Sequence, residues 1–185
     1  MTDENKALEL LKTKIKNENL IKHCLASCAV MKALAKRLGG DEKQWGMAGL
    51  IHDIDVELTQ GRIQDHTKEA EIILKENGFS QEIIEAVKMH NPAAWNFTSQ
   101  NPFHIALRCG ETVTGLIIAS ALVCPDKKLS SVKVSSVLKR MKDKRFAAGA
   151  DRNVIAQAEN LGLNMEEFIS ICLKAMQDIA GQLGL

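Results

Sequence analysis

The sequence predicts an all-α protein. Apolar residues recur at helical spacing along most of the 185 residues, and strand-like alternation is nearly absent. Only Pro92, Pro102 and Pro125 interrupt the chain, so long helices are permitted. Hydrophobic residues make up 45% and charged residues 25%, which is typical of a globular protein and excludes a disordered or collagen-like chain. The length favours a single domain over residues 1–185.

Capping residues and glycines mark the expected helix boundaries in the first half of the chain. Asp3, Asp41 and Ser80 are candidate N-caps, and Gly39 and Gly78 follow two expected helix ends. Another helix ends before an Asn-Pro pair, because proline disfavours helix at the residue before it. The expected helices cover, in order, 3–16, 19–38, 41–52, 65–77 and 80–90, with loops at 54–64 and 93–101.

A long apolar helix is expected from about Pro102 to Val123. Its most apolar part begins at Val113, includes polar residues, and is shorter than the roughly 20 residues that a membrane span needs. It therefore predicts a buried helix. Beyond it, a helix is expected over 132–142, and Asp151 and Asn164 are candidate caps of the last two helices.

Composition and charge exclude several classes of partner. The chain has 24 Lys and Arg against 23 Asp and Glu, a net charge of +1, so no strong field favours nucleic acid or an anionic membrane. Aromatic residues make up 4% and Tyr is absent, which disfavours the stacking of single-stranded bases. The five Cys are odd in number and no signal peptide precedes them, so reduced thiols and a cytoplasmic location are expected.

Histidines and acids in the sequence have the chemistry of metal ligands drawn from several helices. His23, His52, His66 and His90 belong to four different expected helices, and Asp53 directly follows His52. Imidazole and carboxylate are ligands of Zn²⁺, Fe²⁺ and Mn²⁺. A carboxylate can bridge two metals through its two oxygens, and a dinuclear centre lowers the pKa of a bridging water. These residues are therefore candidate ligands.

Glu111 interrupts an otherwise apolar helix. Because Glu is rarely buried unless it is paired, its position independently favours a ligand role. Structural roles are the alternatives: His23 could be a buried core histidine, and the other histidines could lie at helix ends. Asp55 and Glu57 follow the His-Asp pair, and they would either orient histidine ligands or face solvent in the loop.

Three segments carry a family pattern. An early helix, NLIKHCLASCAVMKALA, supplies the first His, AGLIHDID supplies the His-Asp pair, and ALRCGETVTGLIIA supplies the final acid. The order resembles the HD-domain superfamily of metal-dependent phosphohydrolases over roughly residues 20–125, with Glu111 in place of the usual Asp. His66 and His90 match the additional ligands of dinuclear members, as in the diadenosine-tetraphosphatase-like branch. Without Tyr, the chain lacks the Gly-Tyr-Pro signature of the cyclic-dinucleotide branch.

The resemblance implies an HD-domain helical bundle with additional C-terminal helices over about 130–185. It also implies a hydrolase acting on a nucleotide or related small phosphate ester through a metal-activated hydroxide, with His52 and Asp53 catalytic. One or two divalent ions (Fe, Mn or Zn) would be held by His23, His52, Asp53, His66, His90 and Glu111. The candidate phosphate-binding residues are Arg108, Lys144, Arg145 and Arg152.

Three further expectations depend on the same resemblance. The C-terminal helices would cover the site or form a homodimer contact. A di-iron oxygenase of the same fold is one alternative to hydrolysis, because the ligand sets overlap and a fold does not fix a reaction. A catalytically decayed HD module that binds or regulates is the other alternative, and the Glu at position 111 is the feature that motivates it.

Overall fold

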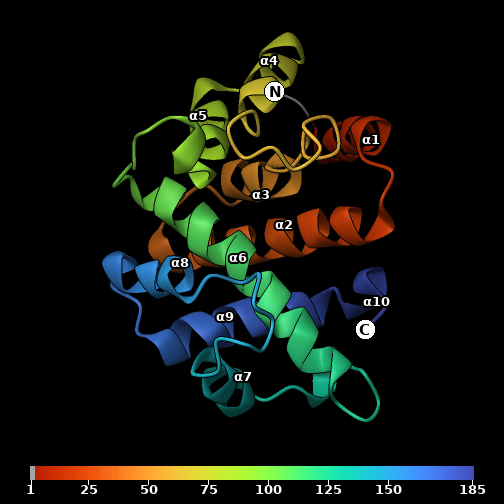
Figure 1. Ribbon diagram of the computed structural model, residues 1–185, viewed down its shortest axis with the longest axis vertical. Coiled ribbons are helices and arrows are strands. Elements are labelled where there is room, and N and C mark those ends of the chain that lie inside the picture. Colours follow the sequence, from red (N-terminus) through yellow and green to blue (C-terminus); the bar gives the residue numbers. More distant parts are fainter. Residues whose placement is uncertain (1–2) are drawn as a thin grey trace.

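A computed structural model describes residues 3–185 and confirms the all-α class (Figure 1). Over these residues the chain has ten α-helices, three short 3₁₀ helices and no strand. The α-helices are α1 Glu4–Lys14, α2 Glu18–Leu38, α3 Glu42–Ile51, α4 Lys68–Glu76, α5 Gln81–His90, α6 Pro102–Leu122, α7 Val134–Met141, α8 Arg152–Ala156, α9 Met165–Asp178 and α10 Ala180–Leu183. The 3₁₀ helices are Pro92–Ala94, Leu129–Ser131 and Gln157–Leu161.

Side-chain caps begin most of the helices that the sequence predicts. Asp41 accepts from the backbone N–H groups at the start of α3, and Ser80 does the same for α5. Asp151 and Asn164 cap α8 and α9 as expected. Asp3 precedes α1, but its side chain makes no capping hydrogen bond, which corrects the expected cap there.

The start of α4 differs most from the sequence expectation. The helix was expected from Asp65, whereas it begins at Lys68 after a chain of turns over 53–67. The residue before it, Thr67, has a positive φ of 77°, which is unusual for a β-branched residue. The carboxylate of Asp55 accepts from the N–H groups of Thr67 and Ala70, so a distant side chain serves as the cap of this helix.

The two longest helices, α2 and α6, cross near the middle of the molecule (Figure 1). α2 contacts α3, α6 and α9, and α6 also contacts α5, α7 and α8. In Figure 1, α3 and α5 lie on one side of this crossing, while α7, α9 and α10 lie on the other. Among the described residues, buried apolar side chains from Ala7 to Leu183 form one continuous core.

By length and composition alone, α6 could cross a membrane. However, 67% of its most apolar window is buried inside the protein, against the helices that surround it. A central core helix passes the same test, so α6 is explained by its packing. This agrees with the buried helix that the sequence predicts.

Two glycines allow other helices to approach α2 closely. A Cβ on Gly49 of α3 would lie 2.6 Å from the backbone oxygen of Ser27 on α2. A Cβ on Gly110 of α6 would lie 3.1 Å from the Leu34 side chain of α2. Only glycine fits the first contact without moving backbone. The approach matters for function because Gly49 lies three residues before His52.

Gly49→Ala is expected to reduce the free energy of unfolding of the metal-free protein by about 1–3 kcal/mol, because the new methyl group overpacks the contact between α2 and α3. Urea denaturation measures this change. Gly115→Ala is a matched control: a Cβ there meets nothing within 4 Å, and alanine in a helix gains about 0.5–1 kcal/mol over glycine. Equal effects of the two substitutions would contradict the packing argument.

Candidate metal centre

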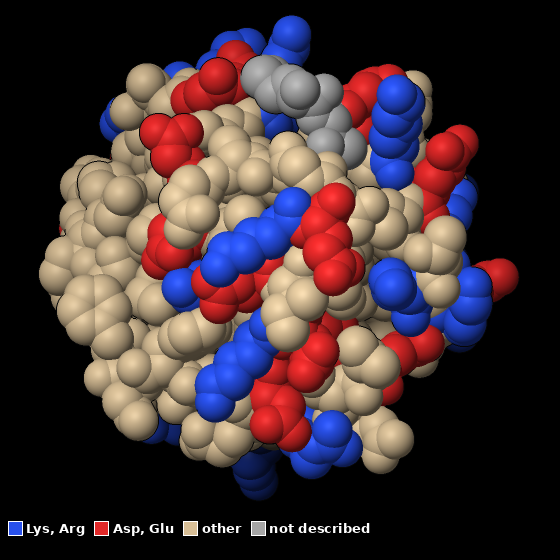
Figure 2. Space-filling model, turned by 90° about the horizontal axis from the view of Figure 1, so that it is seen from above, with Lys and Arg blue, Asp and Glu red and all other residues tan. Residues whose placement is uncertain are grey.

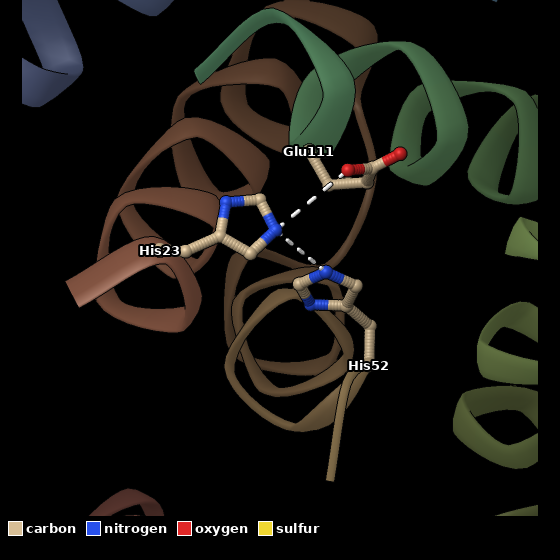
Figure 3. Close-up of side chains that lie close together, drawn as sticks. All are labelled: His23, His52 and Glu111. Atoms are coloured by element: carbon tan, nitrogen blue, oxygen red, sulfur yellow. Dashed lines mark hydrogen bonds and ion pairs between the residues drawn. The ribbon is translucent and has the colours of Figure 1, made fainter. Parts of the chain in front are cut away.

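The structure brings six of the predicted residues into one cluster. The contributing elements are α2 (His23), the end of α3 and the following turn (His52 and Asp53), the turn before α4 (His66), the last residue of α5 (His90) and α6 (Glu111). Figure 3 shows His23, His52 and Glu111 pointing toward one another from α2, the end of α3 and α6. Residues up to 88 positions apart in the sequence therefore meet at one point.

Asp53 lies between two pairs of histidines. Its Oδ2 atom is 3.6 Å from Nε2 of His23 and 3.5 Å from Nε2 of His52. Its Oδ1 atom is 3.3 Å from Nε2 of His66 and 3.5 Å from Nε2 of His90. Each carboxylate oxygen thus faces one pair, which is the arrangement required of a carboxylate that bridges two metals.

The two histidine pairs define two candidate ion positions. In the first, Nε2 of His23 lies 3.1 Å from Nε2 of His52 and 3.7 Å from Oε2 of Glu111. In the second, the Nε2 atoms of His66 and His90 lie 3.0 Å apart. Hereafter the first position means the one at His23, His52 and Glu111, and the second means the one at His66 and His90.

The outer nitrogen of each ring has an oxygen partner that assigns its tautomer. Nδ1 of His52 donates to the carbonyl of Gly49 (2.9 Å), and Nδ1 of His90 donates to the carbonyl of Val87 (2.6 Å). Nδ1 of His66 donates to Oδ1 of Asp55 at 2.7 Å. With Nδ1 protonated, each neutral ring carries its lone pair on Nε2, which faces the cluster.

The tautomer of the fourth ring, His23, is assigned by a hydroxyl group. Nδ1 of His23 lies 2.9 Å from Oγ1 of Thr114. That hydroxyl donates its own hydrogen to the carbonyl of Glu111 at 2.7 Å, so it accepts from His23. Thr114 was not identified from the sequence, although its spacing of three from Glu111 places both on one side of α6.

The converging atoms have the chemistry and the spacing of a metal-binding set. Two lone pairs about 3 Å apart repel unless a proton or a metal ion lies between them. Atoms bound to one ion at about 2.1 Å lie about 3.0 Å apart at a right angle and about 3.4 Å apart at the tetrahedral angle. The two separations between histidine Nε2 atoms, 3.0 and 3.1 Å, lie in this range, and the distances from Nε2 atoms to carboxylate oxygens, 3.3–3.7 Å, lie at its upper end or slightly beyond. Imidazole nitrogens and carboxylates fit Zn²⁺, Fe²⁺ or Mn²⁺.

Burial controls the charge state at the first position. Burial lowers the pKa of His52 to about 3 and also lowers the pKa of His23, so both rings are neutral at pH 7. Burial alone would raise the pKa of Asp53, but the surrounding histidines, His52 foremost, hold it well below its usual range. Neutral imidazoles therefore face an ionised carboxylate, which are the forms that bind metal.

Two other residues of the cluster hold protons at neutral pH. Burial raises the pKa of Glu111 to about 8, and the negative charge of Asp53 adds to this effect. Burial lowers the pKa of His66, but its hydrogen bonds to Asp53 and Asp55 outweigh burial and raise the pKa to about 9. A metal ion binding to these groups would have to displace both protons.

The guanidinium of Arg108 is held by contacts within the fold. Its guanidinium donates to the side chain of Gln157 at 3.0 Å and to the carbonyls of Met89 and Ser99 at 3.2 and 3.1 Å, and the residue is 2% exposed. Every nitrogen of the guanidinium thus already has a partner in the fold, and the predicted substrate-binding role of Arg108 stays a prediction. Arg108 ties α6 to the segments around it.

The other predicted phosphate-binding residues lie in or beside the 142–151 loop. Arg152 donates to backbone carbonyls between positions 140 and 150, and so holds this loop together. Lys144 is exposed, and the side chain of Arg145 is 95% exposed. Within residues 3–185, no hydrogen bond or ion pair joins these three residues to the cluster.

Charges of both signs are interleaved on the face shown in Figure 2. On α4 and α5, Nζ of Lys88 lies 3.3 Å from Glu71 and 3.0 Å from Glu85, and Lys75 pairs with Glu71 at 2.8 Å. These two lysines thus each have a nearby anion, and Figure 2 shows no continuous basic patch on this face.

Comparison with known proteins places these residues within a family. The HD domain model matches residues 20–119, which include all six members of the cluster. Ribonuclease Y of Helicobacter acinonychis (strain Sheeba) is 32% identical over 74 residues, which is 40% of this chain and 14% of that protein. The chain thus spans about a seventh of the length of this relative. No solved structure matches the chain significantly.

The family match covers more than half of the chain and agrees with the helical architecture and the order of the cluster residues. The chain belongs to the HD domain family.

Proposed function

We propose that this protein is a metal-dependent phosphohydrolase that acts on a small phosphate ester, such as a nucleotide. The observation that carries the proposal is the position of Asp53 between two pairs of histidines whose Nε2 atoms face its two oxygens. Membership of the HD domain family supports the same reaction class. The six ligands proposed are His23, His52, Asp53, His66, His90 and Glu111.

Two divalent ions bound by these six ligands would carry a net positive charge together with their ligands. Bound divalent ions supply Lewis acidity and lower the pKa of a bound water. The four imidazoles are neutral ligands, and Asp53 and Glu111 add one negative charge each, so two ions would leave a net charge of about +2. This charge would attract a phosphate without a nearby Arg or Lys. It would do so although no hydrogen bond or ion pair within residues 3–185 joins Lys144, Arg145 or Arg152 to the cluster.

The exposure of the cluster indicates where a substrate would enter. The His52 side chain is 0% exposed, whereas His23 is 21%, Glu111 is 19% and Asp53 is 14% exposed. His52 therefore forms the floor of the cluster, and the other three form its open side. We assign catalytic roles to Asp53, which faces both histidine pairs from the open side, and to His52, which forms the floor.

Ribonuclease Y, by its name, cleaves RNA, and this raises a second candidate substrate. The similarity covers 14% of that protein, and it lies within the shared HD region. The net charge of +1 and the mixed charges in Figure 2 favour a small substrate over an RNA chain. Phosphodiester and phosphomonoester substrates should nevertheless be assayed side by side.

His52→Ala and Asp53→Ala are each expected to reduce metal retention and phosphohydrolase turnover by more than about 100-fold, because loss of a ligand exceeds the 10- to 100-fold effect of losing an outer partner. Metal content is measured by mass spectrometry, and turnover with p-nitrophenyl phosphate, bis(p-nitrophenyl) phosphate and a nucleotide panel. His104→Gln is the matched control, since His104 is a buried histidine bonded to Ser99 rather than to the cluster.

Full activity in either alanine variant would refute the assignment. Oxygen uptake by the iron-loaded protein, with no phosphate release, would favour the oxygenase alternative. Nucleotide binding by a chain that retains no metal and turns over no ester would favour the decayed module.

Metal loading at pH 7 is expected to release close to two protons per chain, because the pKa of Glu111 is about 8 and that of His66 is about 9. The apparent metal affinity should rise with pH and level off above about pH 9. Calorimetric titration in two buffers with different ionisation enthalpies counts the protons. Glu111→Gln should release about one proton fewer, and an unchanged count would contradict the role of Glu111.

A further inference from the structure

Asp55 is a fully buried carboxylate that the proposed reaction does not use. It lies two residues after Asp53, in the turns between α3 and α4, and is 0% exposed. Its Oδ1 accepts from Nδ1 of His66 at 2.7 Å, and its Oδ2 accepts from the N–H groups of Thr67 (2.7 Å) and Ala70 (3.0 Å). Both oxygens are therefore occupied, and neither faces the proposed ions.

His66 differs from the other three rings in its outer partner. The Nδ1 atoms of His52 and His90 meet backbone carbonyls, and that of His23 meets the hydroxyl of Thr114. Only His66 has a carboxylate in this position among the four. A hydrogen bond to a charged acceptor is stronger than one to a neutral oxygen, and it raises the basicity of the opposite ring nitrogen.

The same carboxylate fixes the backbone beside the ring. Thr67 has a φ of 77°, and its own side chain does not cap α4. Asp55 caps the helix instead, and the indole of Trp95 donates to Oγ1 of Thr67 at 2.9 Å. A β-branched residue keeps a positive φ only where its surroundings impose it. Asp55 therefore sets both the tautomer of His66 and the direction from which the ring enters the cluster.

We propose that Asp55 is a positioning residue that controls ion binding at the second position through His66, while the first position does not depend on it. The inference rests on the proposed two-ion centre. It goes further because it assigns separate control to one of the two positions. His23, His52 and Glu111 have no hydrogen bond to Asp55 within the described chain, so their position should keep its affinity.

Asp55→Asn tests the inference with little change in shape. Two backbone N–H groups face one end of the side chain, so the amide oxygen should turn toward Thr67 and Ala70. The amide NH₂ then faces Nδ1 of His66, which must become an acceptor. The ring proton moves to Nε2, where it blocks the second position, while the cap of α4 is kept.

The measurement is equilibrium dialysis of the full chain against Mn²⁺, repeated with Zn²⁺. The wild type should bind two ions, and Asp55→Asn should bind the second ion about 10- to 100-fold more weakly with the first unchanged. Glu57→Gln is the matched control from the same loop. Its carboxylate accepts from the N–H groups of Lys16 and Asn17 rather than from any residue of the cluster, so two ions should remain.

A double-mutant cycle separates positioning from general damage to the fold. In the His66→Ala background, Asp55→Asn should cause no further loss of Mn²⁺ affinity, because its effect passes through the missing ring. Should Asp55→Asn melt too low to study, the same comparison is made in a Thr67→Gly background, where glycine adopts the positive φ without strain.

Several outcomes would overturn the inference. Two ions bound to Asp55→Asn with wild-type affinity would do so, as would an equal loss of both ions or a further loss in the His66→Ala background. A wild type that binds one ion removes the second position and this inference with it, but leaves one-ion hydrolysis standing. A wild type that binds none, even after reconstitution, removes the proposed function as well.

Discussion

Four imidazole rings direct their Nε2 atoms at the two oxygens of a single carboxylate, Asp53, and the surrounding structure holds them there. Each ring is fixed from behind by an oxygen on its Nδ1 atom, so none can rotate to relieve the crowding. At the first position both rings are neutral, so without a cation the Nε2 lone pairs of His23 and His52 would face each other at 3.1 Å. A bound cation would therefore stabilise the cluster, because it would coordinate these lone pairs and offset the buried negative charge of Asp53.

Close packing of α3 and α6 against α2 brings the ligands on these helices together. Gly49 lets α3 touch the α2 backbone, and its carbonyl accepts a hydrogen bond from the Nδ1–H group of His52, one turn further along. Gly110, immediately before Glu111, likewise lets α6 pack closely against α2. At these two contacts, the packing of the helices therefore also determines where the ligands lie. A methyl group added at Gly49 would displace a ligand as well as a helix.

The sequence allows most of the ligand set to be predicted, because His-Asp adjacency and histidines on separate helices are local signals. Capping by Asp41 and Ser80 is equally local. The position of Asp53 between two histidine pairs cannot be predicted from such local signals, since it depends on the conformation of the turn after α3. The partners of Arg108 lie at positions 89, 99 and 157, so its structural role could not be read from its neighbours. The delayed start of α4 likewise depends on Asp55, which lies a dozen residues earlier.

The two ion positions are supported by elements of different rigidity. The first is built on α2, α3 and α6, which pack together in the core. The second joins the last residue of a ten-residue helix to a ring on a turn segment. Local opening of a turn segment costs less free energy than opening of packed core helices. The ions should therefore exchange with solvent at different rates, and brief treatment with a chelator should yield a protein loaded at the first position alone.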